Sequence, residues 1–369
     1  MSLTDFPSVA LRDAPTGISF LKIGRGMRLR TALGTALVGL TLAAVSAGAA
    51  PTSVPDSFYM HAGKLVAVDG PRRLNLSCMG KGSPTVLFDS GAGDSALVWR
   101  LVQGEVARLT RACAYDRAGF GFSDPRRGPS DARASAADLH ALLLAAKIKT
   151  PILYVGHSIA GLYGVLLEAT HPGDLAGAVL VEPSFANQWD ALSSAGIAAG
   201  APQKAADDLL AALHAQVPRI RECATLPAPL PADCAGNDHR LPPDLAAFKK
   251  AQNSRSSYLL TKASEFENFL STKTEKNLDQ KELEAVKTSF GDKPLIVLTR
   301  GNAQGNPGFT TEQSAAIDRA WGAGHDRLAA LSTRGSNIVV PGAGHYIQYD
   351  QPRAVIDAVT RALAEIRGH

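Results

Sequence analysis

Hydrophobic and polar residues form two kinds of segment between residues 55 and 184. Short apolar runs predict buried strands, and longer segments with apolar residues at helical spacing predict helices. The predicted strands are Lys64–Val68, Arg73–Cys78, Thr85–Asp89, Ala112–Asp116, Ile152–Val155 and Ala178–Val181. The predicted helices are Ser95–Arg108, Ala132–Ala146 and Ala160–Thr170. This alternation predicts an α/β fold with a mostly parallel sheet covered by helices.

The alternation stops between residues 185 and 292. Helical patterns such as AADDLLAALHAQV and SEFENFLSTK appear there with prolines and without a convincing strand. Strand and helix patterns return with KPLIVLT, SNIVVPG and PRAVIDAVTRALAEI. We therefore predict one core domain, built from residues 55–184 and 293–369, with a helical cap or lid of residues 185–292 inserted into it.

The first fifty residues contain a predicted secretory signal. Two arginines precede the uncharged run TALGTALVGLTLAAVSAGAA, and Ala47 and Ala49 form the A-x-A arrangement of a cleavage site. The run is long enough for a permanent membrane anchor, which is the alternative, but it is only weakly apolar. We expect residues 1–49 to be removed, with residues 1–26 preceding the natural start, and the mature protein to be secreted or periplasmic without an anchor.

Composition narrows the possible partners. The chain has 369 residues, 45% hydrophobic and 20% charged, which is typical of a globular protein. Without residues 1–49 it keeps 33 of 38 basic and 32 of 34 acidic residues, so no basic field is left to attract nucleic acid or anionic lipid. No phosphate-binding loop or H-E-x-x-H zinc motif occurs. We expect a small-molecule substrate and neither a cofactor nor a metal.

The expected export makes disulfides a reasonable expectation for the four cysteines, because disulfides persist in oxidising compartments. Cys223 and Cys234 bracket the proline-rich loop CATLPAPLPADC, and a bridge there would hold a loop that has no core of its own. Cys78 and Cys113 lie in two separate strand-like runs and could be either bridged or buried as free thiols. Neither pair has the spacing of metal ligands.

A polar serine interrupts the apolar stretch YVGHSIAGLYG. Ser158 is predicted at the end of a strand and the start of a helix, where a sharp turn would project its side chain into a cleft and the helix N-terminus would offer N–H groups to a developing negative charge. Such a turn needs small neighbours, as Gly156 and Ala160 are. Taken alone, the serine could simply cap the helix.

A serine hydroxyl becomes a nucleophile only when a base removes its proton. His345 is the best candidate, since NIVVPGAGHYIQYDQP places it on a glycine-containing loop after the last predicted strand. Open α/β sheets carry their sites at that carboxyl edge. His157 adjoins Ser158, but the turn should direct its ring away from the hydroxyl, and we interpret it as structural.

Together these segments resemble the α/β-hydrolase superfamily, in particular its serine esterase and lipase-like members with a helical lid. The resemblance lies in VLFDSGAGDSALVW, CAYDRAGFGFSDP, YVGHSIAG and PGAGHYIQYDQP, in that order. It implies an eight-stranded, mainly parallel sheet with an antiparallel second strand and a lid after the sixth. Because the second and fourth strands are neighbours in that sheet, it also brings Cys78 close to Cys113.

The resemblance further implies an oxyanion hole made of two backbone N–H groups. One comes from the residue after the nucleophile, Ile159, and the other from the loop after the third strand, where it maps to Ala92 in SGAG. Each such donor typically lowers the barrier of acyl transfer by about 3 kcal/mol.

The acid that orients the histidine departs from the commonest pattern of the superfamily. An aspartate is expected just after the seventh strand, but LIVLTRGNAQGNPGFTTEQ has no carboxylate before Glu312. We predict that the acid is Glu182, at the end of the sixth strand in GAVLVEPS. An unpaired carboxylate at the end of a buried strand would be costly, so Glu182 should have a partner, which we predict to be His345. Glu312 and Asp318 are the alternatives.

The expected activity is hydrolysis of carboxylic esters by a triad of Ser158, His345 and Glu182 through an acyl-enzyme. Amide or peptide hydrolysis is an alternative that would need an acidic or polar amine-binding feature in the lid. Epoxide or haloalkane hydrolysis is disfavoured because its nucleophile would be aspartate. A ligand-binding protein without catalysis is the alternative from another class.

Overall fold

The computed structural model describes residues 54–272 and 275–368. The predicted signal segment, with its cleavage site near residue 50, lies outside these residues. The strands are β1 (Lys64–Asp69), β2 (Arg72–Met79), β3 (Val86–Asp89), β4 (Ala112–Tyr115), β5 (Ile152–His157), β6 (Leu175–Val181), β7 (Leu295–Arg300) and β8 (Gly335–Val340). They form one sheet in the order β1-β2-β4-β3-β5-β6-β7-β8.

Strand direction in this sheet agrees with the prediction. β2 is antiparallel to both neighbours, β1 and β4, and the pairings from β4 through β3 to β8 are parallel. The carboxyl ends of β3, β5, β6, β7 and β8 therefore lie at the same edge. This edge is where an open α/β sheet carries its site.

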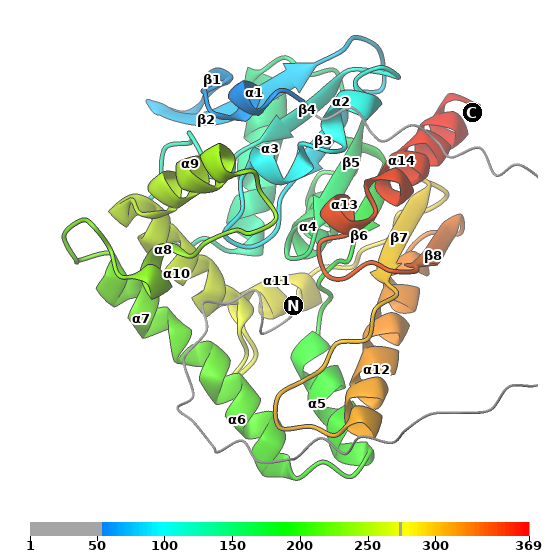
Figure 1. Cartoon of the computed structure of the whole chain (residues 1–369). Coiled ribbons are helices and arrows are strands. Elements are labelled where there is room, and N and C mark those ends of the chain that lie inside the picture. Colours follow the sequence, from blue (N-terminus) through cyan, green and yellow to red (C-terminus); the bar gives the residue numbers. More distant parts are fainter. Residues whose placement is uncertain (1–53, 273–274, 369) are drawn as a thin grey trace, which may run out of the picture. The chain divides into compact units, whose positions relative to one another are not determined.

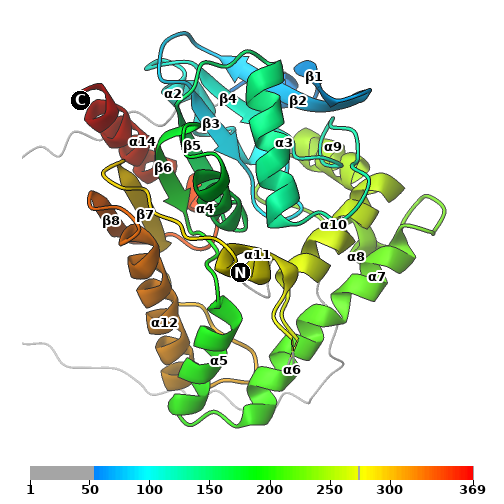
Figure 2. The same ribbon diagram turned by 180° about the vertical axis from the view of Figure 1, so that it is seen from behind.

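Helices cover both faces of the sheet (Figures 1 and 2). They are α1 (Asp56–Tyr59), η2 (a 3₁₀ helix, Ala96–Trp99), α2 (Gln103–Val106), α3 (Ala132–Ala145), α4 (Ala160–Thr170), α12 (Thr311–Ala329), α13 (Ile347–Asp350) and α14 (Pro352–Arg367). Alternate residues of each central strand enter two different cores: Leu87 packs with α3 and α4, whereas Val86 and Phe88 pack with η2, α2 and α14. Burial of both faces explains why these strands are apolar at nearly every position.

The single helix predicted for Ser95–Arg108 is wrong in detail. The segment forms the short helices η2 and α2 instead. Four consecutive residues from Ala96 to Trp99 are buried. A surface α-helix would turn one of its faces to solvent, so a tighter turn enclosed on all sides suits this sequence better.

Residues 185–292, here called the insertion, lie between β6 and β7 and are helical in their described part (Figure 1). The helices are α5 (Gln188–Ala198), α6 (Gln203–His214), α7 (Gln216–Cys223), α8 (Ala232–Ala235), α9 (Pro243–Asn253), α10 (Ser256–Phe269) and α11 (Leu278–Glu284). Among them, α10 contacts the loop that follows β3 at the carboxyl edge of the sheet.

All four cysteines form disulfides. Cys78 and Cys113 are direct partners in the register of β2 and β4, and Cys223 is joined to Cys234 across the proline-rich loop between α7 and α8. Both pairings considered from the sequence are thus present. Among the described residues, no helix combines the length and the apolar character needed to cross a membrane.

Candidate active site

Ser158 lies on a strained turn between β5 and α4. Its φ angle is 55°, a left-handed conformation that is uncommon for residues other than glycine, and its side chain is buried. The backbone holds this conformation because the Ser158 carbonyl accepts hydrogen bonds from the N–H groups of Gly161 (2.9 Å) and Ser184 (2.8 Å). The turn therefore fixes the direction in which the hydroxyl projects.

Close neighbours explain why the residues around the serine are small. A Cβ on Gly156 would lie 2.6 Å from Tyr154 Cε1, and one on Gly161 would lie 2.4 Å from Pro183 Cβ. Position 160, in contrast, accommodates the methyl group of Ala160, which is fully buried. The departure from G-x-S-x-G is consequently compatible with the turn.

His345 lies within hydrogen-bonding distance of the serine. Its Nε2 is 3.0 Å from Ser158 Oγ, although the two residues are 187 positions apart. The loop after β8 places it there, with Gly342 at a φ of 76° and the Gly344 N–H donating to Asp350. A neutral imidazole in this position can accept the hydroxyl proton.

Glu182 occupies the third position of the arrangement, but at longer range. Its Oε1 lies 3.9 Å from His345 Nδ1, which has no hydrogen-bond partner in the described part of the chain. The carboxylate instead accepts hydrogen bonds from the backbone N–H of Arg300 (2.7 Å) and from the Arg300 guanidinium. Glu182 also has a positive φ of 48°, so the chain bends sharply where β6 ends.

The other two acidic candidates do not approach the histidine. Asp318 pairs with Arg300 Nη2 at 2.8 Å and accepts the Gln304 N–H, and Glu312 is exposed in the first turn of α12. Of the three predicted acids, Glu182 is the one that lies next to His345.

Electrostatics favour an ionised acid beside a neutral base. Burial acts to raise the pKa of Glu182, but the attraction of Arg300 and the contact with His345 outweigh it and hold that pKa well below its usual value. Burial lowers the pKa of His345 well below 6.5, and Glu182 only partly opposes this effect. The imidazole is therefore neutral at pH 7.

His157 acts on His345 rather than on the serine. Its Nε2 lies 2.9 Å from the His345 carbonyl oxygen, and the two rings are 4.9 Å apart. Burial lowers the pKa of His157 to about 4, so the ring is neutral and donates to that carbonyl. This contact fits the structural role predicted for His157.

The two predicted oxyanion donors have no acceptor within the described residues. Neither the N–H of Ile159 nor that of Ala92 makes a hydrogen bond there. The loop that carries Ala92 lies against the serine, because a Cβ on Gly91 would be 3.3 Å from Ser158 Cβ. Two unpaired N–H groups close to a serine can receive a developing oxyanion.

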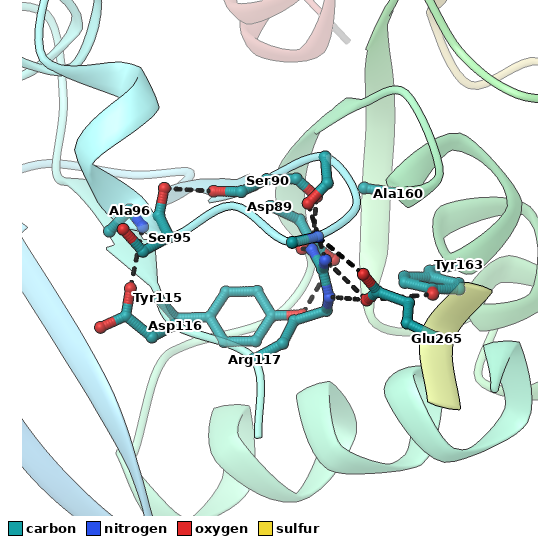
Figure 3. A network of polar contacts seen from close by, with 12 residues as sticks. Asp89, Ser90, Ser95, Ala96, Tyr115, Asp116, Arg117, Ala160, Tyr163 and Glu265 are labelled. Atoms are coloured by element: carbon teal, nitrogen blue, oxygen red, sulfur yellow. Dashed lines mark hydrogen bonds and ion pairs between the residues drawn. The ribbon is translucent and has the colours of Figure 1, made fainter. Parts of the chain in front are cut away.

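Arg117 holds that loop from beneath (Figure 3). Its guanidinium donates to the carbonyl oxygens of Ser90 and Gly91 and to the carboxylate of Asp89. In a trans peptide the C=O and the following N–H point in opposite directions. Binding the Gly91 carbonyl therefore turns the Ala92 N–H away from Arg117.

Glu265 of α10 completes this network from the insertion. Its Oε1 accepts from Arg117 Nη2 at 2.8 Å, and its Oε2 accepts from the Gly93 N–H at 2.8 Å. The Tyr258 hydroxyl donates to the Gly93 carbonyl at 2.8 Å. The sequence analysis missed these contacts because 148 residues separate Arg117 from Glu265, although a charge directly after a buried strand in CAYDRAGFG was a signal for Arg117.

We expect Glu265→Gln to lower kcat about 10- to 100-fold while KM changes little, because an amide can satisfy only one of the two donors and the Ala92 N–H would lose its fixed direction. Glu267→Gln is the matched control, since Glu267 is on the same helix but pairs with Arg221 at the surface. Kinetics normalised to titrated active sites provide the measurement. Equal kcat values for both variants would contradict a role in positioning the loop.

One group of potential metal ligands lies in the described residues, formed by His140, His171 and Asp174. His140 Nδ1 is hydrogen-bonded to Asp174 at 2.7 Å, and the two imidazoles are stacked with centroids 3.8 Å apart and an interplanar angle of 7°. Lone pairs in the planes of stacked rings do not converge on one point. The group is therefore arranged as a hydrogen-bonded cluster at the C-terminal end of α4.

Comparison with known proteins identifies the family. Residues 86–358 match the model of the alpha/beta hydrolase family, a range that includes Ser158, Glu182 and His345. The chain belongs to this family, and the fold and superfamily predicted from the sequence are confirmed.

Curated relatives match over shorter stretches. The chain is 38% identical over 119 residues to a probable transporter, efuK, of Hormonema carpetanum, which is 31% of this chain and 16% of that protein. It is 30% identical over 122 residues to the uncharacterized protein YqjL of Bacillus subtilis, covering 33% of this chain and 48% of YqjL. The chain thus spans less than half the length of these relatives.

Solved structures share the fold at low identity. A thermophilic esterase from Thermogutta terrifontis matches with a TM-score of 0.52 and 17% identity, over 83% of this chain and 99% of that one. A putative epoxide hydrolase from Pseudomonas aeruginosa matches with a TM-score of 0.54 and 16% identity, over 82% and 96%. A haloalkane dehalogenase variant from Bradyrhizobium elkanii matches with a TM-score of 0.56 and 18% identity, over 84% and 97%. The fold supports a hydrolase without defining which bond it cleaves.

Proposed function

We propose that this protein is a serine hydrolase that cleaves carboxylic esters. The observation that carries the proposal is the 3.0 Å distance between Ser158 Oγ and His345 Nε2, on a turn that strains the serine backbone. A helix-capping serine would need neither the strain nor an imidazole from a loop 187 residues away.

The proposed reaction has two halves. His345 takes the proton of Ser158 as Oγ attacks the ester carbonyl, and the N–H groups of Ile159 and Ala92 stabilise the resulting oxyanion. Collapse of the tetrahedral intermediate expels the alcohol, which receives the proton from His345, and leaves an acyl-enzyme. Water, deprotonated by His345, then attacks the acyl carbon and releases the acid and the free serine.

Glu182 would orient His345 and stabilise its cation. Its 3.9 Å separation from Nδ1 would have to shorten as positive charge develops on the ring, which the ionised carboxylate favours. Arg300 keeps Glu182 ionised and holds it in place through the hydrogen bond from its backbone N–H.

The other chemistries of the family fit the site less well. Epoxide hydrolases and haloalkane dehalogenases are expected to use an aspartate where this chain has Ser158. An aminopeptidase-like activity would need a free acidic group in the insertion; Glu265 lies in the right region, but Arg117 and Gly93 occupy both of its oxygens.

The test of this function is a panel of p-nitrophenyl esters of graded acyl length, assayed beside the matching p-nitroanilides. We expect turnover of the esters and at most slow release from the anilides. Faster release from the anilides would favour the amidase alternative, and binding of esters without turnover would favour a non-catalytic role.

We also propose that the protein works outside the cytoplasm. The predicted signal and the two disulfides support this location. N-terminal sequencing of protein recovered from an exporting host should find a start at Ala50 or Pro51, and a retained Met27 would refute it.

A further inference from the structure

One face of α10 lies on the loop that carries Ala92. Tyr258, Lys262 and Glu265 are spaced four and three residues apart, so their side chains project from the same side of the helix. Tyr258 and Glu265 bind the carbonyl and the N–H of Gly93. Lys262 lies between them, and a Cβ on Gly93 would be 3.4 Å from its Cε.

Lys262 differs from its two neighbours because its charge is not matched. In the described part of the chain, no carboxylate lies within ion-pair distance of its ammonium, which lies over the Phe266 ring, 5.8 Å from the ring centroid. Burial lowers the pKa of Lys262, and the attraction of Asp94 and Glu265 offsets this effect only in part. The residue as a whole is half-buried rather than enclosed.

The nearby carboxylates are already paired with other groups. Asp94 accepts from Lys249 at 2.8 Å and from the Tyr346 hydroxyl at 3.0 Å. Glu265 is paired with Arg117 at 2.8 Å. A charge in a partly desolvated position is stabilised by an opposite charge, and these carboxylates are already used by other partners.

Lys262 lies near the loop that also approaches Ser158. Gly91 contacts the Ser158 turn and Gly93 contacts Lys262. These two glycines are two residues apart, a span of at most about 7 Å. A substrate whose carbonyl oxygen lies at the Ala92 N–H therefore has Lys262 within reach of a nearby substituent.

We propose that Lys262 is an anion-binding residue of the substrate site, so that the preferred esters carry a carboxylate a few bonds from the reacting carbonyl. The expected preference in ester hydrolysis rests on the proposed function, whereas the expected binding of an anion does not. It names a substrate class, because an ester with an uncharged group at that place would leave the ammonium unpaired.

The kinetic test compares matched substrates that differ in one charge. Monoethyl adipate is compared with the ethyl ester of adipamic acid for an anion on the acyl side, and O-acetylglycolate with O-acetylglycolamide for an anion on the alcohol side. A charge-assisted hydrogen bond in a partly desolvated site should raise kcat/KM for the anion about 10- to 100-fold in at least one pair.

Variants assign the preference to Lys262. Lys262→Gln should abolish it while changing kcat/KM for the uncharged esters by no more than about threefold, because the oxyanion donors are intact. Lys262→Arg keeps the charge and should keep most of the preference. Lys250→Gln, at an exposed lysine of α9, is the matched control and should behave as wild type.

A binding measurement separates this inference from the proposed function. Calorimetric titration of wild type and Lys262→Gln with adipate and adipamide requires no turnover. Binding of adipate that weakens at least about tenfold in Lys262→Gln supports the anion site even if no ester is hydrolysed. Hydrolysis without a preference for anions, or adipate binding that is equal in both proteins, would overturn it and leave the esterase proposal in place.

Discussion

Replacing Ser158 by alanine should abolish ester hydrolysis and labelling by a fluorophosphonate probe. The hydroxyl is the group that His345 approaches to 3.0 Å, and within the described residues the N–H groups of Ile159 and Ala92 make no hydrogen bond. Loss of a triad nucleophile typically costs about 10⁶-fold in kcat. Fluorescence of the labelled protein on a gel and a turnover assay both measure the effect.

Ser194→Ala is the control, since Ser194 is an exposed serine on α5. It should be labelled and should turn over substrate like wild type. Labelling that persists in Ser158→Ala would show that the nucleophile lies elsewhere, and peptide mapping of the adduct would then locate it.

Replacing Glu182 by glutamine should lower kcat by roughly 10⁴-fold, by analogy with other triads in which the acid is converted to its amide. The amide keeps the size of the side chain but loses the charge that stabilises the imidazolium. Because Glu182 also binds Arg300, melting temperature must be recorded with kcat, so that lost activity is not confused with lost fold.

Two further variants distinguish the predicted acid from its alternatives. Asp318→Asn removes the other partner of Arg300 without touching His345, and Glu312→Gln changes an exposed carboxylate. We expect both to keep activity within about tenfold of wild type. If Asp318→Asn or Glu312→Gln is inactive while Glu182→Gln remains active, the acid comes from the region after β7 and Glu182 belongs to the structure.

Local patterns were sufficient to find the strands and the ends of the strands that carry the site. The run before Ser158 is apolar because β5 is buried on both faces, and Glu182 stands out as a charge at the end of another such run. Arg300 ends β7 in the same way, and the same argument would have found it.

Contacts between distant segments could not be read from the chain in this way. Glu265 lies within a pattern, SEFENFLSTK, that indicates only a helix, and nothing in that pattern distinguishes the buried Glu265 from the exposed Glu267. The difference arises when α10 packs on the Gly93 loop, which is a tertiary event. The break between η2 and α2 has a similar origin, because enclosure by the core decides the local conformation.

The hydrogen bonds from α10 to Gly93 make the insertion part of the framework that holds the proposed active site, and not a separate cover. During synthesis, the loop is made long before the helix that anchors it, 172 residues later in the case of Glu265. Exchanging insertions between family members to alter specificity would also exchange these anchors. If the proposed site is correct, an active chimera built on this core would need a carboxylate and a hydroxyl at the positions of Glu265 and Tyr258, whatever the rest of its insertion contains.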